Sequence, residues 1–552
     1  MTNKAIAKTF QYLADIMELH GENPYKIRSY ANAYLQLRKL DMPLADMDPA
    51  EIGAIKGVGE AISAKIQELL QTGHLNTLKK YEDQTPEGVR EMLQVPGFGP
   101  KKVRVIWKDL GVETIGELLY ACNENRLVEL KGFGEKTQED LRQKLLYYQQ
   151  AQGRFHYATL DKAAQPLLNW LQGQLPGVRI ELCGDIRRKL PILTHIEILL
   201  GTTGALDALF AEGGLQDQQT LENGLLAQTT EGLPVKLYPC EPETFGSKWF
   251  RYTGEGQFLK AFAERSPGTD FKGLAGENEV FQKAGLPYLA PELREDTFWL
   301  DQAAAGKLPT LLEEHDIKGV VHVHSTYSDG LHSLEQMARA AKDMGYQYLL
   351  ITDHSQSAFY ANGLKVDRLE QQWTEIEALN RELAPFVIFK GIESDILNDG
   401  SLDYPDDILA QFDAVIASVH SNLRMDQEKA TARLIKAIEN PYTSILGHPT
   451  GRLLLSREGY PIDHLKIIDA CAKNGVAIEL NANPHRLDLD YTWIQAALER
   501  GVKICINPDA HSMEGIRDIR YGVAAARKGG LDAANCLNTR DANGFKNSLR
   551  RP

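Results

Sequence analysis

Side chains that could bind metal ions are concentrated in the C-terminal part of this 552-residue chain, where ten of the fourteen histidines lie between His315 and His511. Nine residues there combine imidazole and carboxylate groups, which together suit zinc, manganese or iron. With roughly four to six ligands per ion and some of them shared, the set predicts two or three divalent ions, with the Glu393 carboxylate as the bridge. The nine candidates are His322, His324, Asp329, His354, Glu393, His420, His448, Asp509 and His511.

Short apolar runs precede most of these residues and predict the elements that position them. Seven runs alternate with helical segments from Lys318 onward; the first, GVVHVHS, contains His322 and His324, and the last, VKICINPDAH, ends at Asp509 and His511. This alternation predicts parallel β/α units that close into a barrel, whose strand ends converge on one mouth. A single strand-end histidine is usually a hydrogen-bonded core or rim residue, but six at the same end of successive strands predict a metal site.

Hydrolysis of a phosphate ester is the reaction that such a site predicts, because divalent ions both activate water near neutral pH and clamp a phosphate. Arg452, in the loop after Gly447-His448-Pro449, is a candidate for holding a second phosphate. Three other histidines lack the strand-end position: His332 and His464 are expected at the surface or around the site, and His485 is a candidate for substrate contact. The predicted catalytic residues are His322, His324, Glu393, Asp509 and His511.

Four motifs in this segment resemble the PHP superfamily, named for polymerase and histidinol phosphatase. They are His-Val-His-Ser with a following Asp-Gly, Thr-Asp-His-Ser, Gly-His-Pro and Asp-Ala-His. The resemblance implies the same nine ligands. Some relatives have histidine at the position of Asp329, a difference that bears on metal preference and leaves the site complete.

Three Gly-x-Gly segments in the first 150 residues predict helix-hairpin-helix units: IKGVGEAISAKI from Ile55, VPGFGPKKVRVI from Val95 and LKGFGEKTQEDL from Leu130. Glycine lets a turn approach a phosphate closely, and the amides of the following helix point at the anion, so such units hold a DNA backbone without reading its sequence. A single copy could merely join packed helices, but three copies favour DNA binding. The predicted DNA-contacting residues are Gly57, Gly59, Gly97, Gly99, Gly132 and Gly134.

This region resembles the lyase domain and fingers of family X DNA polymerases, including the stretch from Asn23 to Tyr30. The resemblance implies that Lys65 matches the lysine that forms a Schiff base at abasic sites, which requires a depressed pKa. The alternative is an ordinary helix lysine or a phosphate contact. Ala61 replaces a second basic residue common in the family, which counts against lyase activity.

Residues 151–310 resemble the palm and thumb of the same polymerases, but the palm lacks the three aspartates that hold two metal ions. His195, Glu197 and Lys236 stand at these positions. Two-metal nucleotidyl transfer needs clustered oxygen ligands, and a fixed lysine charge opposes a cation by on the order of a few kcal/mol. We therefore predict an inactive polymerase site. The alternative is weak activity through other carboxylates such as Asp185.

Composition and charge limit the remaining possibilities. The net charge is −14, but residues 1–150 hold 20 Lys+Arg against 21 Asp+Glu. This N-terminal region is therefore near neutral and can still bind DNA through backbone amides and a few cations. The six scattered cysteines form no CxxC pair and indicate neither a disulfide framework nor a thiolate site. Without a signal peptide or an apolar run of about 18 residues, we expect a cytoplasmic, non-membrane protein that acts as a monomer.

Over residues 5 to 545 the order of these parts resembles the bacterial PolX family. The resemblance implies a DNA repair enzyme whose barrel is a 3′→5′ exonuclease, AP endonuclease or 3′-phosphatase acting on gapped, nicked or 3′-end DNA. Mg²⁺ or Mn²⁺ accompanying the DNA is a further expected cofactor. Two alternatives stay open: a working gap-filling polymerase, and a small-molecule phosphatase of the histidinol phosphate type.

The expected fold is multidomain α/β. It comprises a lyase-like hairpin domain at 1–85, fingers-like hairpins at 86–150, an α+β polymerase-beta-like palm at 151–240, a thumb at 241–310 and a (β/α)7 PHP barrel at 311–552.

Overall fold

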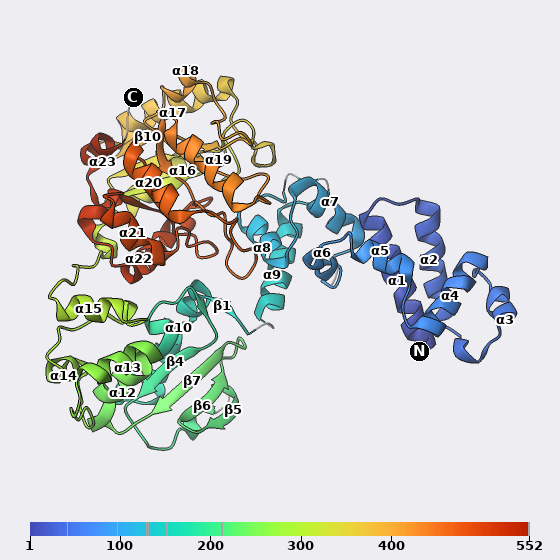
Figure 1. The fold of residues 1–552 in the computed structure, drawn as a ribbon, viewed down its shortest axis with the longest axis horizontal. Coiled ribbons are helices and arrows are strands. Elements are labelled where there is room, and N and C mark those ends of the chain that lie inside the picture. The colour runs from blue at the N-terminus through green and yellow to red at the C-terminus, as the bar shows by residue number, and fades with distance from the viewer. Residues whose placement is uncertain are drawn as a thin grey trace. The chain divides into compact units, whose positions relative to one another are not determined.

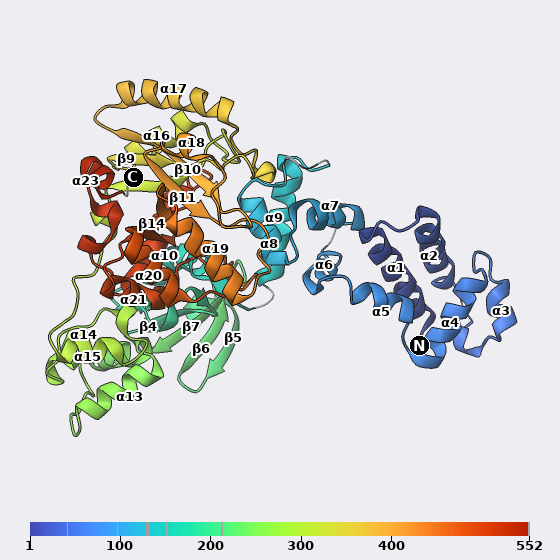
Figure 2. The ribbon, with the colours of Figure 1, turned by 45° about the horizontal axis from the view of Figure 1, so that its top comes forward.

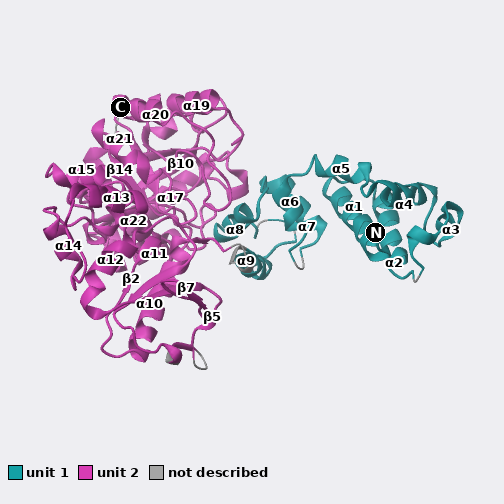
Figure 3. Ribbon diagram, turned by 60° about the horizontal axis from the view of Figure 1, so that its bottom comes forward, with its two compact units in different colours: residues 1–148 teal, residues 149–552 magenta. Residues whose placement is uncertain are grey.

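The computed structural model describes residues 1–40, 42–95, 98–128, 130, 132–150, 153–210 and 214–549. The chain divides into two compact units, residues 1–148 and 149–552, shown in teal and magenta in Figure 3. None of the described helices is both long and apolar enough to cross a membrane.

The first unit is helical and contains two hydrophobic cores. The first core includes Phe10, Leu13 and Ile66, and the second includes Val103, Ile106 and Leu118. Each hairpin pairs a helix with the one that follows its glycine turn, as in α3 with α4 and α6 with α7. The helices are α1 (Asn3–Leu19), α2 (Pro24–Leu37), α3 (Pro49–Ala54), α4 (Glu60–Thr72), α5 (Asn76–Glu82), α6 (Glu87–Met92), α7 (Pro100–Leu110), α8 (Ile115–Asn123) and α9 (Glu135–Gln150).

The second unit begins with an α+β region built on a five-stranded sheet of order β2-β4-β7-β6-β5. Helices α10 and α12 pack against this sheet, and the short ribbon β1–β3 lies beside α10 (Figure 1). The elements are β1 (Phe155–His156), α10 (Tyr157–Gln174), β2 (Ile180–Leu182), α11 (Gly184–Arg187), β3 (Ile192–Leu193), β4 (Ile196–Leu200), β5 (Gln216–Leu221), β6 (Gly224–Gln228) and β7 (Pro234–Pro239).

A small helical region follows, with a core rich in phenylalanine that includes Phe250, Phe258, Phe262 and Phe281. Its aromatic rings contact one another at centroid distances of 4.7–6.0 Å, which suits tilted and edge-to-face packing. The helices are α12 (Phe245–Thr253), α13 (Gly256–Arg265), α14 (Glu277–Lys283) and α15 (Phe298–Ala304).

The last region is a seven-stranded parallel sheet of order β14-β13-β12-β11-β10-β9-β8. Hydrogen bonds from His324 N to Ala510 O (2.9 Å) and from Ala510 N to His322 O (3.2 Å) join its two edges, so the sheet is nearly closed into a barrel. Figure 2 shows α17 and α19 on the outer side of the strands. This arrangement confirms the predicted fold class, including the seven-stranded barrel.

The barrel strands are short and almost completely buried, as their apolar runs predict. The strands are β8 (Gly319–Val323), β9 (Tyr348–Ile351), β10 (Val387–Asp395), β11 (Ala414–Ser418), β12 (Thr443–Leu446), β13 (Ala477–Asn481) and β14 (Ile504–Asn507). The helices are α16 (Leu334–Asp343), α17 (Val366–Leu383), α18 (Asp406–Leu409), α19 (Gln427–Glu439), α20 (His464–Asn474), α21 (Ile494–Glu499), α22 (Ile519–Lys528) and α23 (Ala542–Ser548).

Candidate metal centre and DNA-contacting hairpins

Two candidate ligands sit on strained backbone where the barrel closes. His322 has φ +65° and Asp509 has φ +52°, a region that L-residues other than glycine rarely occupy. At His322 the register between β8 and β9 shifts, between Val321 and Val323. The strain lets β8 present both His322 and His324 to the same interior point, and such outliers persist where the surrounding structure fixes them.

Glu393, near the end of β10, lies at the centre of the candidate ligands. Its Oε1 is 3.0 Å from His448 Nε2, 3.1 Å from His420 Nε2 and 3.2 Å from His322 Nε2. Its Oε2 is 2.9 Å from His354 Nδ1. One carboxylate thus faces four imidazoles from four different strands or strand ends, which is the geometry of a ligand shared between ions.

Two aspartates complete the ligand set. Asp509 Oδ1 is 3.1 Å from His324 Nε2 and 3.5 Å from His322 Nε2. Asp329 Oδ1 is 3.3 Å from His511 Nε2, and its Oδ2 is 3.5 Å from His354 Nε2. The structure therefore brings all nine sequence-predicted ligands into one buried cluster.

Three groupings within the barrel could each hold an ion, since their ligand atoms lie within 4.8 Å of one another. Two groupings share His324, and two share His354, so neighbouring ions could have ligands in common, while the number of ions stays a prediction. The groupings are His324, Asp329, His354 and His511; His322, His324 and Asp509; and His354, Glu393 and His420.

The pKa values of the cluster show how strongly its groups depend on each other's charge. Burial by itself raises the pKa of Glu393, but the surrounding histidines, His420 first, outweigh burial and hold it well below its ordinary value. Burial by itself lowers the pKa of His354, but Asp329 and Glu393 outweigh it and raise that pKa to about 10. For His324, burial and the neighbouring His511 and His354 lower the pKa to about 3.

Several ligand atoms of the cluster are buried and, although some lie within 3.2 Å of one another, their angles do not make hydrogen bonds: His322 Nε2, His324 Nδ1, both ring nitrogens of His354, and Glu393 Oε2. A buried polar atom without a partner costs free energy, so a cluster of them aimed inward requires compensation. Divalent cations provide it, because imidazole and carboxylate lone pairs are their natural ligands. The residues present therefore fit bound metal ions.

Two carboxylates orient ligand histidines by contacting the ring nitrogen that faces away from the cluster. The sequence did not predict this role for either of them. Glu479 Oε2 is 2.7 Å from His322 Nδ1, and Asp395 Oδ1 is 2.6 Å from His420 Nδ1. A carboxylate on the outer ring nitrogen fixes which nitrogen faces the metal and raises its basicity. The signal for Glu479 was present in the sequence as a single charged residue inside the apolar strand AIELN.

Two loop residues proposed for substrate contact prove to have structural partners. Arg452 Nη1 pairs with Asp490 at 2.5 Å and Nε donates to Arg486 O at 2.9 Å, so its guanidinium is bound to the segment after β13, and the phosphate-holding role stays a prediction. The His485 ring packs edge-on against the ring of His156, in the α+β region, at 4.3 Å between centroids. A ring packed in this way does not have the exposed position expected for a substrate contact. Sequence spacing could not show either partner.

The remaining two histidines lie outside the metal-ligand groupings, as predicted. His332 Nδ1 accepts from Met513 N at 3.4 Å, and the His464 ring stacks on Trp493 at 4.3 Å.

The hairpin glycines lie where open space surrounds them. A Cβ added at Gly59, Gly99, Gly132 or Gly134 would meet no atom within 4 Å, and one at Gly57 would meet only Gln36 Cγ at 3.6 Å. Gly57 and Gly132 have φ values of +86° and +91°, which require glycine. Gly59 and Gly99 cap α4 and α7, so free helix amides follow each turn. Gly97 lies outside the described residues.

Lys65, on α4, is half-buried and its Nζ donates to Thr77 Oγ1 at 3.1 Å. This bond fits an ordinary helix lysine at least as well as a nucleophile, so the lyase assignment stays a prediction.

Two of the three altered palm positions lie on neighbouring strands, with Glu197 on β4 opposite Lys236 on β7, and His195 directly precedes β4. The Glu197 carboxylate accepts from Tyr238 Oη and from Asp185 N, both at 3.0 Å, and burial raises its pKa. Burial and then Lys236 lower the pKa of His195. Among the described residues, no grouping of three or more potential metal ligands falls in this region.

The two palm arginines, Arg187 and Arg188, are bound to carboxylates. Arg187 makes a bidentate pair with Glu277 at 2.7 Å, and Arg188 contacts Asp185 at 2.6 Å and Glu295 at 3.2 Å. These ion pairs connect the palm to the helical region.

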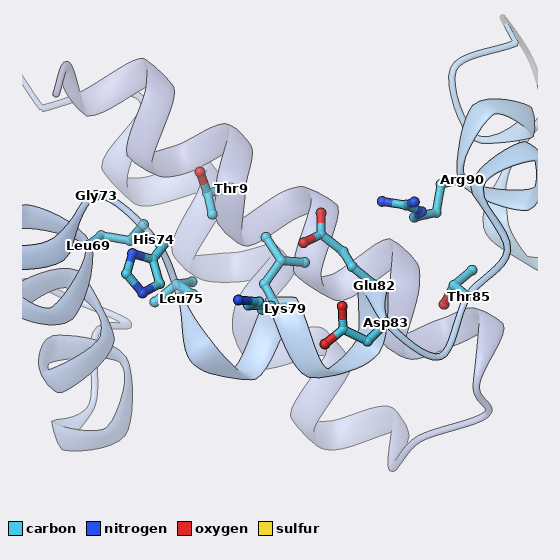
Figure 4. A pocket seen from close by; sticks show the side chains of 11 residues that line it. Thr9, Leu69, Gly73, His74, Leu75, Lys79, Glu82, Asp83, Thr85 and Arg90 are labelled. Carbon is cyan, nitrogen blue, oxygen red and sulfur yellow. The ribbon is translucent and has the colours of Figure 1, made fainter.

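A cavity within the first unit lies between α1, α4, α5 and α6 (Figure 4). Its charged lining combines Lys79 and Arg90 with Glu82 and Asp83. Because the cations are matched by carboxylates, the cavity offers no net positive field for a phosphate, and we do not place the DNA contact there.

Three family models match the chain: a helix-hairpin-helix domain over residues 1–75, a SAM-like helix-hairpin-helix tandem over 89–145, and a PHP domain over 321–483. Across 575 aligned residues, covering 100% of both chains, the sequence is 33% identical to the DNA polymerase/3'-5' exonuclease PolX of Bacillus subtilis. The chain belongs to the PolX family. This result confirms the resemblance that the motifs suggested.

In this PolX protein the barrel also matches shorter relatives on its own. It is 30% identical over 231 residues to a probable phosphatase of Thermoanaerobacter sp. (strain X514), covering 40% of this chain and 89% of the relative. It is 32% identical over 207 residues to a probable phosphatase of Caldanaerobacter subterraneus, covering 34% and 74%. The PHP barrel therefore occurs both within PolX and by itself.

Proposed function

We propose that the barrel of this PolX protein is a metal-dependent phosphodiesterase that removes nucleotides from DNA 3′ ends. The observation that carries the proposal is the convergence of nine histidine and carboxylate side chains around Glu393, with buried ligand atoms that have no hydrogen-bond partner. The relative that matches the whole chain is named as a polymerase and 3'-5' exonuclease, which supports this substrate class.

Two or three divalent ions, zinc, manganese or iron, would be held by the nine ligands, and they would supply a water activated near neutral pH and a clamp for the phosphate. The chain's own residues hold and orient these ligands. Glu479 and Asp395 fix the ring orientations of His322 and His420, and the burial of the cluster excludes bulk water. His322, His324, Glu393, Asp509 and His511 are the residues we propose as catalytic.

The hairpins would hold the DNA backbone, since their capping glycines leave room for a phosphate in front of free helix amides. The substrates would then be gapped, nicked or 3′-ended DNA. AP endonuclease or 3′-phosphatase activity of the same site, the accompanying Mg²⁺ or Mn²⁺, the five domain boundaries, the monomeric state and the cytoplasmic location stay predictions.

We further propose that the palm does not polymerise. Its one retained acidic ligand, Glu197, is held by Tyr238 and the Asp185 amide, and Asp185 itself is paired with Arg188. Lys236 stands beside Glu197 where a cation would have to bind. Among the palm residues that the structure describes, these contacts leave no cluster of free carboxylates for two-metal nucleotidyl transfer.

The deciding experiment follows a 5′-labelled gapped duplex in Mn²⁺, with and without dNTPs, for the wild type and the His322→Ala plus His324→Ala variant. Shortening by the wild type alone, with extension by neither protein, is the expected result. Extension by the variant would show an active palm. If neither protein changes the DNA, the second candidate gains support: a small-molecule phosphatase, which the barrel's matches to probable phosphatases favour.

A further inference from the structure

The loop between β9 and α17 carries a phenylalanine that the fold leaves in water. Phe359, in the short 3₁₀ turn Phe359–Ala361, is 81% exposed, the highest fraction for any large hydrophobic side chain that the structure describes. Leaving a phenylalanine exposed forgoes about 1.5–3 kcal/mol of hydrophobic stabilisation. Its ring meets the neighbouring Tyr360 ring edge-on, at 5.7 Å between centroids, and most of its surface stays in water.

Backbone and side-chain hydrogen bonds hold this loop in place. Leu364 N donates to His354 O at 2.8 Å, and Gly363 N donates to Ala358 O at 3.0 Å. Ser357 N donates to Asp403 Oδ2 at 2.7 Å. The backbone that carries Phe359 is thereby fixed, so the ring is presented to solvent by a closed loop.

The loop also belongs to the framework of the metal centre. It starts directly after His354, and the neighbouring Tyr360 ring lies 6.2 Å from the His354 ring and 5.7 Å from the Phe359 ring. Ser357 Oγ donates at 3.0 Å to Asp395, the carboxylate that orients His420. The Tyr360 ring thus links the Phe359 ring to the ring of His354, a candidate metal ligand.

An exposed cation ends the same loop. Lys365 precedes α17 as its N-terminal cap residue, and its side chain is exposed. Proteins that hold single-stranded nucleic acid combine aromatic rings, on which bases stack, with cations that follow the phosphates. A protein partner would instead require an apolar patch around Phe359, and no other residue of this loop is among the exposed large hydrophobics that the structure describes.

We propose that Phe359 is a stacking platform for a nucleobase next to the scissile 3′ end, so that the barrel prefers an unpaired 3′ terminus. The inference rests on the proposed exonuclease function and adds a substrate-recognition residue to it. A base can stack on Phe359 only with its π-face free, which a terminal or frayed nucleotide offers and a paired internal one does not.

The test compares Phe359→Ala, Phe359→Leu and Phe359→Trp on a 5′-labelled single-stranded oligonucleotide and on the same oligonucleotide with two tetrahydrofuran abasic nucleotides at its 3′ end. On the normal oligonucleotide we expect Phe359→Ala and Phe359→Leu to raise KM about 10-fold with little change in kcat, because base–aromatic stacking is lost. Phe359→Trp should keep the wild-type KM. On the abasic end the wild type and Phe359→Ala should have the same KM.

Phe298→Ala is the matched control, since Phe298 is also exposed, at 39%, but lies on α15 in the thumb region. It should leave KM unchanged on both substrates. An unchanged KM for Phe359→Ala on the normal end, or an equal loss on the abasic end, would refute stacking. A wild type that leaves both oligonucleotides intact while hydrolysing p-nitrophenyl phosphate would refute the exonuclease function itself, and this inference with it.

Discussion

At the scale of single residues, the metal centre depends on groups behind the ligands. Glu479 contacts His322 Nδ1 at 2.7 Å. It also accepts hydrogen bonds from Asn507 Nδ2 at 2.7 Å and from His448 N at 3.1 Å. Its two oxygens thus connect three segments of the barrel. Replacing it removes a charge and an acceptor without removing a ligand.

We therefore predict that Glu479→Gln lowers metal affinity by about 10- to 100-fold, the usual effect of losing a carboxylate behind a ligating histidine. Mn²⁺ titration of hydrolysis should show activity shifted to higher metal concentration and largely recovered at saturation. Glu377→Gln is the control, because Glu377 is an exposed residue of α17 that pairs with Lys390 and is not among the candidate ligands or their partners. Identical Mn²⁺ curves for Glu479→Gln and wild type would contradict this role.

The sequence predicted which side chains the fold gathers, because chemistry and spacing coincide in them. The nine candidates lie in or after buried strands, as in His322 within β8, Glu393 within β10 and Asp329 in the loop after β8, and their role as metal ligands stays a prediction. Glu479 was missed because it lies in the middle of an apolar run and outside the four motifs. The partners of Arg452 and His485 were missed because they come from loops and from another region of the chain.

At the scale of elements, the hairpins make a testable unit. Gly59 has ordinary extended backbone, with φ −84° and ψ 172°, and a side chain there would point into open space in front of α4. Gly59→Val should therefore fold normally but obstruct a phosphate. We predict about a 10-fold weaker binding of gapped DNA in fluorescence anisotropy, with a reduced salt dependence because a backbone contact is lost.

Gly256→Val is the matched control for this change. Gly256 also begins a helix, α13, and its added Cβ would meet no atom within 4 Å. Equal DNA affinity for the two variants would show that this hairpin does not contact the DNA.

A second element-scale prediction concerns acid stability of the thumb. Glu277 begins α14 and pairs with Arg187 at 2.7 Å and with the fully buried Arg294 at 2.6 Å. Burial alone raises the pKa of Glu277, but the two arginines outweigh it and lower that pKa to about 2. Because the folded pKa lies below the ordinary 4.5, the stabilisation is present above pH 4.5 and is lost as the pH falls toward about 2.

Glu277→Gln should destabilise the second unit by about 3–5 kcal/mol near neutral pH, because it leaves the Arg294 charge buried and unpaired. Its loss of stability between pH 5 and 3 should be smaller than that of the wild type, since the titrating group is gone. Denaturant unfolding across this pH range measures both effects. Parallel curves for the two proteins would show that Glu277 does not carry the acid sensitivity.

At the scale of the whole molecule, the palm and thumb are joined to the barrel by buried contacts. The fold class followed from the order of motifs, but this contact could not be predicted, because it is made by residues distant in sequence. Lys528, at the end of α22, has a fully buried side chain that pairs with Glu295 and donates to Arg188 O at 2.9 Å. Arg527 Nε, on the same helix, likewise donates to Glu292 Oε1 at 2.8 Å.

Such buried contacts between palm, thumb and barrel predict that residues 149–552 unfold as one cooperative unit. Lys528→Met should lower its stability by about 1.5–3 kcal/mol, because Glu295 loses a charged hydrogen bond but keeps Arg188 at 3.2 Å. Lys546→Met, which removes an exposed cation 3.4 Å from Asp413, should change stability by less than about 1 kcal/mol. Calorimetry distinguishes the outcomes. One transition that shifts to lower temperature in Lys528→Met would mean that palm, thumb and barrel form one folding unit. Separate palm and barrel transitions in the wild type would mean that the two regions fold independently.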